Sequence, residues 1–262
     1  MATLQKKAPK ISVVIVNYKT WQTTLNLYKL LTNCQDLEII IIDNGPDDTL
    51  KKNIENSSDK IRYFLMDKNL GYAGAINKGV SYANGQWILI LNNDIEVECH
   101  KVMELLKITV NSNFLVSAPR LIDMHNNIQE SIGYFDGVKE HFINFLLARP
   151  RFIDAKNLRD NTSVDLAIGG AILFNKQVIN KIGNWDSEFF MYFEDIDFCL
   201  RLKKENIPIL YTPNISFLHH GSLTANQDKK VKEVNYQTAK KRYILKHRGY
   251  FINVLNNIFH LF

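Results

Sequence analysis

Within residues 185–201, the three closely spaced carboxylates of Glu194, Asp195 and Asp197 lie among aromatic and other apolar residues. A carboxylate in such surroundings must be paired, bound to a cation, or left with a raised pKa that suits it to accept a proton. On a helix, Glu194 and Asp197 share a face with Arg201 at spacings of three and four, whereas Asp195 lies on the adjacent face. The spacing predicts that Asp197 pairs with Arg201. It leaves Asp195 as the candidate general base, with Glu194 as the alternative.

A second group of polar residues lies in the first half of the chain. Asn17, Asp43 and Asp94 each follow closely on a nearly continuous apolar run, the pattern of a strand that is covered on both faces. In open parallel sheets, ligands bind beyond the carboxyl ends of the strands. Three polar strand tips on one edge therefore predict one binding site.

Strands and helices must alternate to hold these tips. Strand patterns occur at 11–18, 37–43, 61–65 and 87–91, and helix patterns occur from about 20 to 34, from about 49, after the glycine-rich segment 69–79, and at 101–111. Such alternation is typical of an α/β domain with a mostly parallel sheet. Further strand-like pieces follow at 115–119 and 164–174. Between them, the aromatic and basic segment 134–158 is predicted to be a helix or loop over the site.

Composition narrows the class of protein. With 262 residues, 46% of them hydrophobic, the chain can bury a sizeable core. The three cysteines, Cys34, Cys99 and Cys199, fit neither a disulfide framework nor a closely spaced zinc site, so we expect a reducing compartment. No apolar run reaches the roughly 18–20 residues that span a bilayer. We expect residues 1–10 to be a short basic leader rather than a signal peptide. We expect a cytoplasmic protein, soluble or peripheral at the inner face of the cytoplasmic membrane.

The segment 226–262 is basic and then amphipathic. Eight lysines and arginines fall within 229–248, and apolar residues follow at mostly helical spacing. Such a segment can lie on an anionic membrane, pack back on the domain or contact another subunit, and the sequence leaves these alternatives open. A nucleic-acid partner is disfavoured, because no nucleic-acid-binding motif accompanies the charge.

Taken together, the motifs resemble those of family-2 glycosyltransferases with the A-type fold, in particular the bacterial rhamnosyltransferases and galactofuranosyltransferases of surface polysaccharide synthesis. The likeness covers roughly 11–221, and its elements occur in the family's order: Val16-Asn17-Tyr18, Ile42-Asp43-Asn44-Gly45, Asn69-Leu70-Gly71 with Asn77 and Gly79, Leu91-Asn92-Asn93-Asp94, Gly169-Gly170-Ala171, the acidic segment 194–197, and His219. The resemblance implies a single-domain A-type (Rossmann-like) α/β fold with a mostly parallel central sheet flanked by helices. Its nucleotide-binding half is 11–98 and its acceptor-binding half 99–225, before the C-terminal helical segment 226–262.

The resemblance also implies the chemistry: inverting transfer of a sugar from a nucleotide-diphosphate donor to a saccharide acceptor that is lipid-linked. dTDP-L-rhamnose is the first expected donor, and UDP-galactofuranose or another UDP-hexose is the alternative. The residues expected to bind the nucleotide are Asn17, Asp43, Asn69, Gly71, Asn77 and Asn93. Asp94 and His219 are expected to hold Mg²⁺ or Mn²⁺, although Asn92 stands where the family usually has an aspartate. Gly170, Trp185 and Asp186 are expected at the acceptor.

Simpler structural roles and other functions stay open. The amide and glycine residues could equally form turns and helix caps, and His219 could simply bond to backbone. A sugar nucleotidyltransferase should carry a glycine-rich basic loop directly after the first strand, and residues 17–20 contain no glycine. The chain could also be a catalytically silent carbohydrate-binding subunit of an assembly complex, or one module of a larger polymerase.

Overall fold

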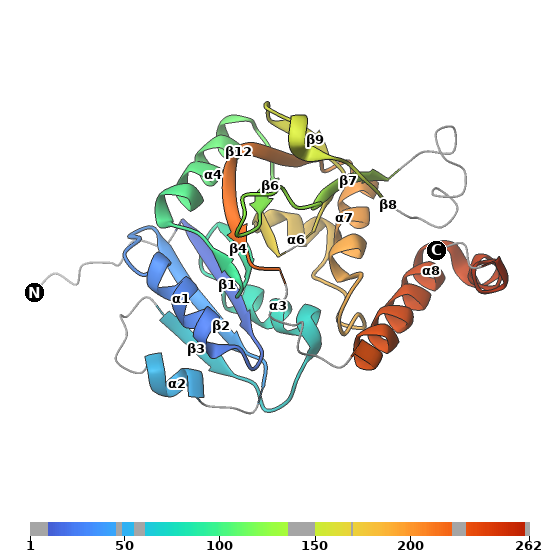
Figure 1. Ribbon diagram of the computed structural model, residues 1–262, viewed down its shortest axis with the longest axis horizontal. Helices are drawn as coiled ribbons and strands as arrows, with labels where there is room; N and C mark the ends of the chain where they lie inside the picture. The colour runs from blue at the N-terminus through green and yellow to red at the C-terminus, as the bar shows by residue number, and fades with distance from the viewer. Residues whose placement is uncertain are drawn as a thin grey trace, which may run out of the picture.

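The computed structural model describes residues 10–45, 49–54, 61–135, 150–168, 170–221 and 229–259. Within these ranges, nine strands form one mixed sheet in the order β3-β2-β1-β4-β11-β6-β12-β5, with β9 paired to β12 (Figure 1). The strands are β1 (Ile11–Asn17), β2 (Leu37–Asp43), β3 (Ile61–Leu65), β4 (Trp87–Asn92), β5 (Ile95–Glu96), β6 (Val116–Ile122), β9 (Thr162–Val164), β11 (Ala171–Asn175) and β12 (Ile209–His219). The predicted run of parallel strands is confirmed for β1 to β4, and β11 then enters the sheet antiparallel to β4 and β6.

The parallel strands end together at one edge of the sheet. In the register of β1 with its neighbours, Asn17 lies opposite Asp43 and Val16 lies opposite Asn92. The predicted strand tips are therefore neighbours, as expected for parallel strands of similar length.

Helices cover both faces of the sheet, which explains why the central strands are apolar on both sides. The helices of the domain are α1 (Trp21–Leu31), α2 (Thr49–Ile54), α3 (Gly71–Tyr82), α4 (Cys99–Asn111), α6 (Gln177–Ile182) and α7 (Glu194–Lys204). Apolar residues of α1, α2 and α4 form one buried cluster with Val13 and Ile15 of β1. Those of α3, α6 and α7 form a second cluster with Val14 and Val16 of the same strand.

The segment predicted as a helix or loop over the site differs from that prediction. Its described part includes the end of β7 (Ile132–Phe135), all of β8 (Pro150–Phe152) and a short 3₁₀ turn at Ala155–Asn157. The two strands form a small antiparallel sheet with β10 (Leu166–Ala167), which lies beyond the segment. Backbone pairing is possible because Gly133 lacks a side chain: a Cβ there would lie 2.3 Å from the Arg151 carbonyl oxygen. Residues 136–149 lie outside the described ranges.

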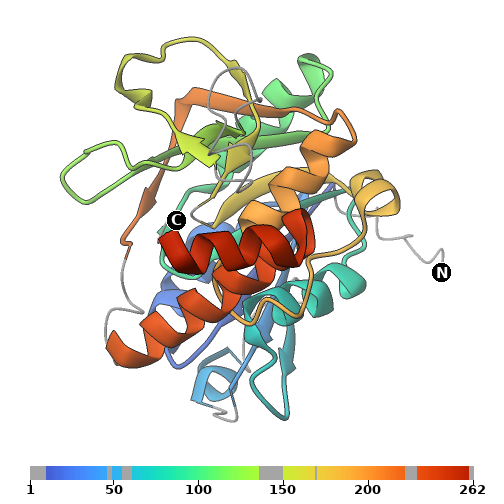
Figure 2. The same ribbon diagram turned by 90° about the vertical axis from the view of Figure 1, so that its right-hand side faces the viewer.

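The C-terminal basic segment forms α8 (Lys229–Phe259), whose backbone is interrupted at Gly249, where φ is +82°. Ala239, Tyr243 and Ile244 of α8 are buried. In both ribbon views the helix lies beside α7 (Figures 1 and 2). Of the alternatives left open by the sequence, packing back on the domain is confirmed for this part of α8. In the part of the chain with described coordinates, we find no helix with the length and apolar content to cross a bilayer.

The sequence predicted no disulfide framework, but the structure contains a disulfide between Cys34 and Cys99, whose Cα atoms are 5.6 Å apart. Cys34 follows α1 and Cys99 begins α4, and these helices cover the same face of the sheet. The two residues are separated by 65 positions, so no local spacing signals the pair. Cys199 is buried in α7, where its thiol contacts the Ala167 carbonyl oxygen at 3.5 Å.

Candidate active site

Asp43 is held firmly at the tip of β2. Its side chain is buried, and its two carboxylate oxygens accept hydrogen bonds from the Asn17 amide (2.7 Å) and the Tyr63 hydroxyl (2.6 Å). Tyr63 lies on the neighbouring strand β3, and no sequence pattern singled it out. These contacts fix where the carboxylate lies at the strand edge. Recognition of a nucleobase by Asp43 stays a prediction.

Asn93 joins the tip of β4 to helix α1. Its amide nitrogen lies 2.6 Å from the Thr20 hydroxyl and 2.9 Å from the Thr24 hydroxyl, and Thr24 in turn donates to Asn17 (2.8 Å). Asn17 and Asn93 therefore set the spacing of the strand tips through bonds within the protein. Any contact of these two amides with the nucleotide stays a prediction.

The loop before α3 is fixed by a pair of asparagines. The Asn69 side-chain oxygen accepts from the Asn44 amide and from the Gly71 backbone, both at 2.9 Å. Gly71 has φ +73°, and a Cβ there would lie 2.5 Å from the Phe190 carbonyl oxygen. Because the Tyr72 backbone also donates to that oxygen (2.8 Å), this glycine serves close contact with the segment before α7.

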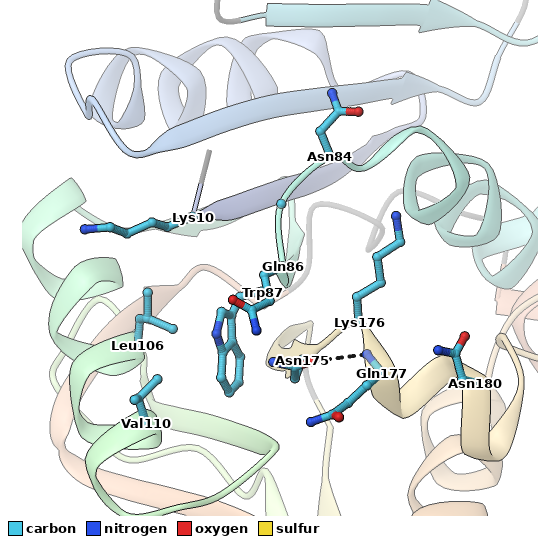
Figure 3. Close-up of a pocket in the computed structure, with 11 residues that line it drawn as sticks. Lys10, Asn84, Gln86, Trp87, Leu106, Val110, Asn175, Lys176, Gln177 and Asn180 are labelled. Carbon is cyan, nitrogen blue, oxygen red and sulfur yellow. Dashed lines mark hydrogen bonds between the residues drawn. The ribbon is translucent and has the colours of Figure 1, made fainter. Parts of the chain in front are cut away.

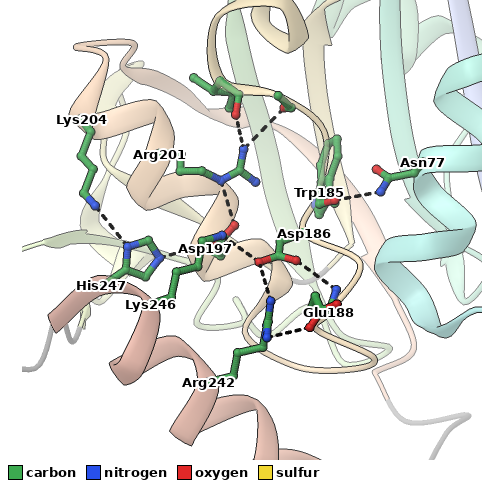
Figure 4. Close-up of polar contacts among 12 residues, drawn as sticks. Asn77, Trp185, Asp186, Glu188, Asp197, Arg201, Lys204, Arg242, Lys246 and His247 are labelled. Carbon is green, nitrogen blue, oxygen red and sulfur yellow. Dashed lines mark hydrogen bonds and ion pairs between the residues drawn. The ribbon is translucent and has the colours of Figure 1, made fainter. Parts of the chain in front are cut away.

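Asn77 connects the same helix to Trp185, donating its amide to the Trp185 carbonyl oxygen at 2.8 Å (Figure 4). The indole ring is buried and stacks on Phe198, with ring centroids 3.8 Å apart and planes 6° apart. The structure thus uses Asn77 and Trp185 to join α3 to α7. Their expected roles at the nucleotide and the acceptor stay predictions.

Tyr72 lies where the strand tips meet α7. Its hydroxyl donates to the side-chain oxygen of Asn92. Burial raises the pKa of Tyr72 well above its ordinary value, and the negative charges of Asp195, Glu194 and Asp94 raise it further. The charges of two acids of α7 and of the acid after β4 thus act on one hydroxyl, which the sequence did not single out. Tyr72 itself joins the tip of β4 to the segment before α7, since its hydroxyl bonds to Asn92 and its backbone donates to Phe190.

Asp195 and Glu194 differ in their surroundings. Glu194 is buried, and no hydrogen-bond partner for its Oε2 is found within the described ranges. Burial and the adjacent charge of Asp195 raise the pKa of Glu194, which favours its protonated form. Asp195, by contrast, is only half-buried. The helix that carries both begins directly after Tyr192 and Phe193, whose φ values of +70° and +65° are strained for aromatic residues.

Asp197 confirms the predicted pair and binds more cations than expected. Its carboxylate, fully buried, lies 2.8 Å from Arg201 Nε, 2.6 Å from Lys246 Nζ and 2.9 Å from His247 Nε2 (Figure 4). Burial alone would raise its pKa, but the hydrogen bond from His247 and the charges of Arg201 and Lys246 lower the pKa to about 2. Asp197 is therefore a structural anion that binds α8 to α7.

Asp186 is the second anchor of α8. One of its oxygens lies 2.9 Å from Lys246 Nζ and 3.4 Å from an Arg242 nitrogen, and the other accepts from the Glu188 backbone at 3.0 Å. Lys246 thus bridges Asp186 and Asp197, which flank the segment that delivers the two acids of α7 (Figure 4). The sequence placed Asp186 at the acceptor, and that role stays a prediction beside this observed one.

Asp94 and His219 are brought together by the pairing of β5 with β12, in which His219 lies opposite Ile95. His219 Nε2 lies 3.4 Å from Asp94 Oδ1, and each side chain is 13% exposed. Burial opposes ionisation of Asp94, but the hydrogen bond and charge of His219 lower its pKa overall. Within the described ranges, no cluster of three or more His, Cys, Asp or Glu side chains could hold a metal.

One carboxylate and one imidazole nevertheless fit a divalent cation that takes its remaining ligands from phosphate and water. Two atoms 3.4 Å apart can both reach one ion at metal–ligand distances of about 2.0–2.2 Å. The pair therefore fits Mg²⁺ or Mn²⁺ as a partial site, which a diphosphate would complete.

Gly170 admits the side chain of Asn92. It has φ +82°, and a Cβ there would lie 2.0 Å from Asn92 Cγ. Its neighbour Gly169 lies outside the described ranges. Since Asn92 accepts from Tyr72, this glycine supports the strand tip directly, and its expected contact with the acceptor stays a prediction.

Replacing Gly170 by alanine should lower both stability and donor binding, because the new Cβ must displace Asn92. Gly183→Ala is the matched control: its φ is +75°, yet no atom lies within 4 Å of the added Cβ. The control should show only the strain of positive φ, about 1–3 kcal/mol in chemical unfolding, whereas Gly170→Ala should cost more. Equal losses in the two variants would show that Asn92 is not crowded.

A large cavity lies away from these residues. It has a volume of about 790 Å³ and adjoins the amino-terminal ends of β1 and β4 (Figure 3). Lys10, Trp87 and Asn175 contribute to its lining, and none of the predicted site residues does. The candidate site is thus located by the polar strand tips at the carboxyl edge of the sheet and not by cavity size.

Comparison with known proteins identifies the family to which the chain is similar. The profile of the family described as "Glycosyl transferase family 2" matches residues 12–183. The hexosyltransferase Agl10 of low-salt glycan biosynthesis in Haloferax volcanii is 30% identical over 80% of this chain and 67% of its own length. Rhamnosyltransferase WbbL of Escherichia coli is 23% identical over 70% of this chain and 83% of its own. The dTDP-rhamnosyl transferase RfbF of Shigella flexneri is 24% identical over 85% of this chain and 71% of its own length.

Solved structures with the same fold include GalNAc-T7 with UDP, GalNAc and Mn²⁺ (TM-score 0.63, 16% identity) and residues 1–349 of S. aureus TarS (TM-score 0.57, 12% identity). The first alignment covers 81% of this chain and 44% of that chain, and the second covers 96% and 72%. At these identities the likeness concerns the fold, and it confirms the predicted A-type α/β architecture. The profile match ends before Trp185, so the placement of α7 and His219 rests on the structure.

Proposed function

The chain belongs to glycosyl transferase family 2, and from that membership we propose that it transfers L-rhamnose from dTDP-L-rhamnose to a saccharide acceptor. The activities named for WbbL and RfbF support rhamnose as the sugar. UDP-galactofuranose or another UDP-hexose is the alternative donor, which fits the hexosyltransferase Agl10. Glycan biosynthesis, the setting named for Agl10, is the setting that we propose for this chain.

The observation that carries the proposal is the position of Tyr72, which bonds to Asn92 at the tip of β4 and to Phe190 before α7, and whose hydroxyl is affected by the charges of Asp94, Glu194 and Asp195. A donor at the strand tips would place its diphosphate beside Asp94 and its sugar toward α7. Asp195, the more exposed of the α7 acids, then accepts the proton of an acceptor hydroxyl while that oxygen bonds to the anomeric carbon. The bond from the anomeric carbon to the diphosphate oxygen breaks, and its electron pair leaves with the nucleoside diphosphate. Attack from the opposite side inverts the anomeric centre.

Asp94 and His219 would hold the divalent cation in this scheme. When bound, Mg²⁺ or Mn²⁺ supplies Lewis-acid stabilisation of the diphosphate leaving group. Asp43 would face the imide of uracil or thymine, held in place by Asn17 and Tyr63.

A thermal-shift panel of UDP, dTDP, GDP and their sugars, each with Mn²⁺ or with EDTA, tests donor binding. We expect uridine or thymidine diphosphates to raise Tm, and to raise it more with Mn²⁺. Asp94→Ala should lose the Mn²⁺-dependent part of the shift, whereas Asp160→Ala, at an exposed loop aspartate, should keep it. A wild-type protein that responds to none of these nucleotides would favour a catalytically silent carbohydrate-binding subunit.

We also propose that the acceptor is lipid-linked and that α8 brings the enzyme to an anionic membrane surface. Val231, Val234 and Leu245 are exposed apolar residues on this helix, and exposed lysines accompany them. Apolar residues next to lysines suit the interface of an anionic bilayer.

Charge reversal on α8 tests membrane binding without removing the helix, which binds Asp186 and Asp197. We expect the triple variant Lys229→Glu, Lys232→Glu and Lys241→Glu to reduce sedimentation with phosphatidylglycerol-containing vesicles. A matched triple variant at exposed lysines of the domain, Lys51→Glu, Lys107→Glu and Lys181→Glu, should bind such vesicles more than the α8 variant does. Equal binding by the two variants would argue against α8 as the membrane-binding element.

A further inference from the structure

Gln129 makes two hydrogen bonds to a single residue, His219. Its side-chain nitrogen donates to the His219 carbonyl oxygen at 2.9 Å, and its side-chain oxygen lies 2.7 Å from His219 Nδ1. The other ring nitrogen, Nε2, faces Asp94 Oδ1 at 3.4 Å. One carboxamide therefore holds both the backbone and the ring of the histidine that meets Asp94.

These two bonds together determine which ring nitrogen of His219 carries the hydrogen. A carboxamide oxygen can only accept, so the ring nitrogen that faces it, Nδ1, must carry the hydrogen. In a neutral imidazole the lone pair then lies on Nε2. Turning the amide of Gln129 around would place its oxygen against the His219 carbonyl oxygen and its NH₂ group against Nδ1–H. The bond to the carbonyl thus specifies which atom of Gln129 faces the ring.

The chain around Gln129 is built to keep it there. Its backbone nitrogen donates to the Leu121 carbonyl oxygen at 2.9 Å, and the adjacent Ile128 pairs with Ile122 of β6. Gly221 leaves room for the carboxamide, since a Cβ at that position would lie 3.2 Å from the Gln129 side-chain nitrogen. Loop 123–128 thus returns Gln129 to the end of β12.

We propose that Gln129 is a positioning residue for the divalent cation, holding His219 so that the Nε2 lone pair and the Asp94 carboxylate face the same point. The inference rests on the proposed function of Asp94 and His219 as cation ligands. A histidine ligand generally gives its second ring N–H to an acceptor that fixes tautomer and orientation, and loss of that acceptor commonly costs 10- to 100-fold in metal affinity. The side-chain oxygen of Gln129 is such an acceptor for His219 Nδ1–H. Its side-chain nitrogen also binds the His219 carbonyl oxygen and so holds the backbone of the histidine.

Mn²⁺ binding by the purified full chain tests the proposal, with free Mn²⁺ measured by EPR and dTDP included as the phosphate ligand. Gln129→Leu removes the acceptor and should weaken Mn²⁺ binding about 10- to 100-fold. Gln129→Glu keeps an acceptor for Nδ1–H but loses the donor to the His219 carbonyl, and it should bind Mn²⁺ at least tenfold more tightly than Gln129→Leu. If Gln129 only stabilised the fold, the two variants would lose Mn²⁺ affinity equally, and that result would overturn the proposal.

Two further measurements separate this inference from the proposed function. His219→Ala should weaken Mn²⁺ binding at least as much as Gln129→Leu does. If His219→Ala weakens binding and Gln129→Leu does not, only the role of Gln129 is overturned. If His219→Ala binds Mn²⁺ like the wild type, the proposed cation site is overturned with it.

The ¹⁵N shifts of the wild-type histidines test the tautomer in the unaltered protein, so this arm does not depend on a variant that folds. The signal that disappears in His219→Ala identifies the residue. We expect it to report hydrogen on Nδ1, and hydrogen on Nε2 alone would overturn the proposal.

Discussion

Asp195→Asn is expected to lower the turnover of dTDP-L-rhamnose by about 10²- to 10⁴-fold, the usual contribution of a general base, with donor affinity near that of the wild type. The amide has almost the same shape as the carboxylate but cannot accept the acceptor's proton. Asp195 is the partly exposed acid at the start of α7, so the change affects the chemical step more than folding. Release of dTDP in the presence of acceptor gives turnover, and calorimetric titration with dTDP gives donor affinity.

Glu194→Gln is the matched control for this prediction. Burial and the charge of Asp195 already raise the pKa of Glu194, so glutamine imitates the protonated acid. We expect this variant to keep most of the turnover. The reverse pattern, with an active Asp195→Asn and an inactive Glu194→Gln, would transfer the role of base to Glu194.

Asp197→Ala, two residues further along the same helix, is expected to destabilise the fold by about 3–5 kcal/mol, the usual cost of removing one member of a buried ion pair. It would leave Arg201, Lys246 and His247 facing one another without their shared anion. Chemical unfolding at neutral pH measures the loss. The control is Asp36→Ala at the exposed pair with Lys10, for which we expect about 0–1 kcal/mol.

The pH dependence of the free energy of unfolding gives a second test of the role of Asp197. Asp197 has a pKa of about 2 in the folded state against an ordinary value of 3.8, so its stabilising contribution is complete above about pH 4. The contribution is lost as the pH falls from about 4 to 2, where the folded protein takes up the proton. Asp197→Ala should therefore lose less stability than the wild type over this interval. Parallel curves for the two proteins would contradict the role assigned to this carboxylate.

Local patterns predicted part of this architecture correctly. The four parallel strands and their polar tips followed from apolar runs ending at Asn17, Asp43 and Asn92, because burial on both faces leaves a plain signal in sequence. The Asp197–Arg201 pair followed from helical spacing alone. Both signals depend only on residues that are close together in the chain.

The remaining contacts join residues that are far apart in the chain, so local sequence spacing could not predict them. Gln129 and His219 are 90 residues apart, and the disulfide closes a separation of 65. Gly71 was predicted to let a ligand approach, and the structure uses its missing side chain to admit Phe190. The resemblance to a family suggested which residue types meet a ligand. The resemblance did not single out Tyr72, which bonds to Asn92 at the tip of β4 and whose hydroxyl is affected by the charges of the nearby acids.

The sheet separates two apolar clusters, and this division has a consequence for how the protein tolerates change. Helices α3, α7 and α8 pack on one side, and α1, α2 and α4 on the other. Among random core substitutions, those beneath α1 and α4 should chiefly reduce the amount of folded protein in a cell. Those beneath α3 and α7 should also reduce the specific activity of the molecules that do fold. In a mutational scan that scores abundance and activity separately, we therefore expect substitutions on one side of the sheet to lower abundance alone. Substitutions on the other side should lower abundance and specific activity together.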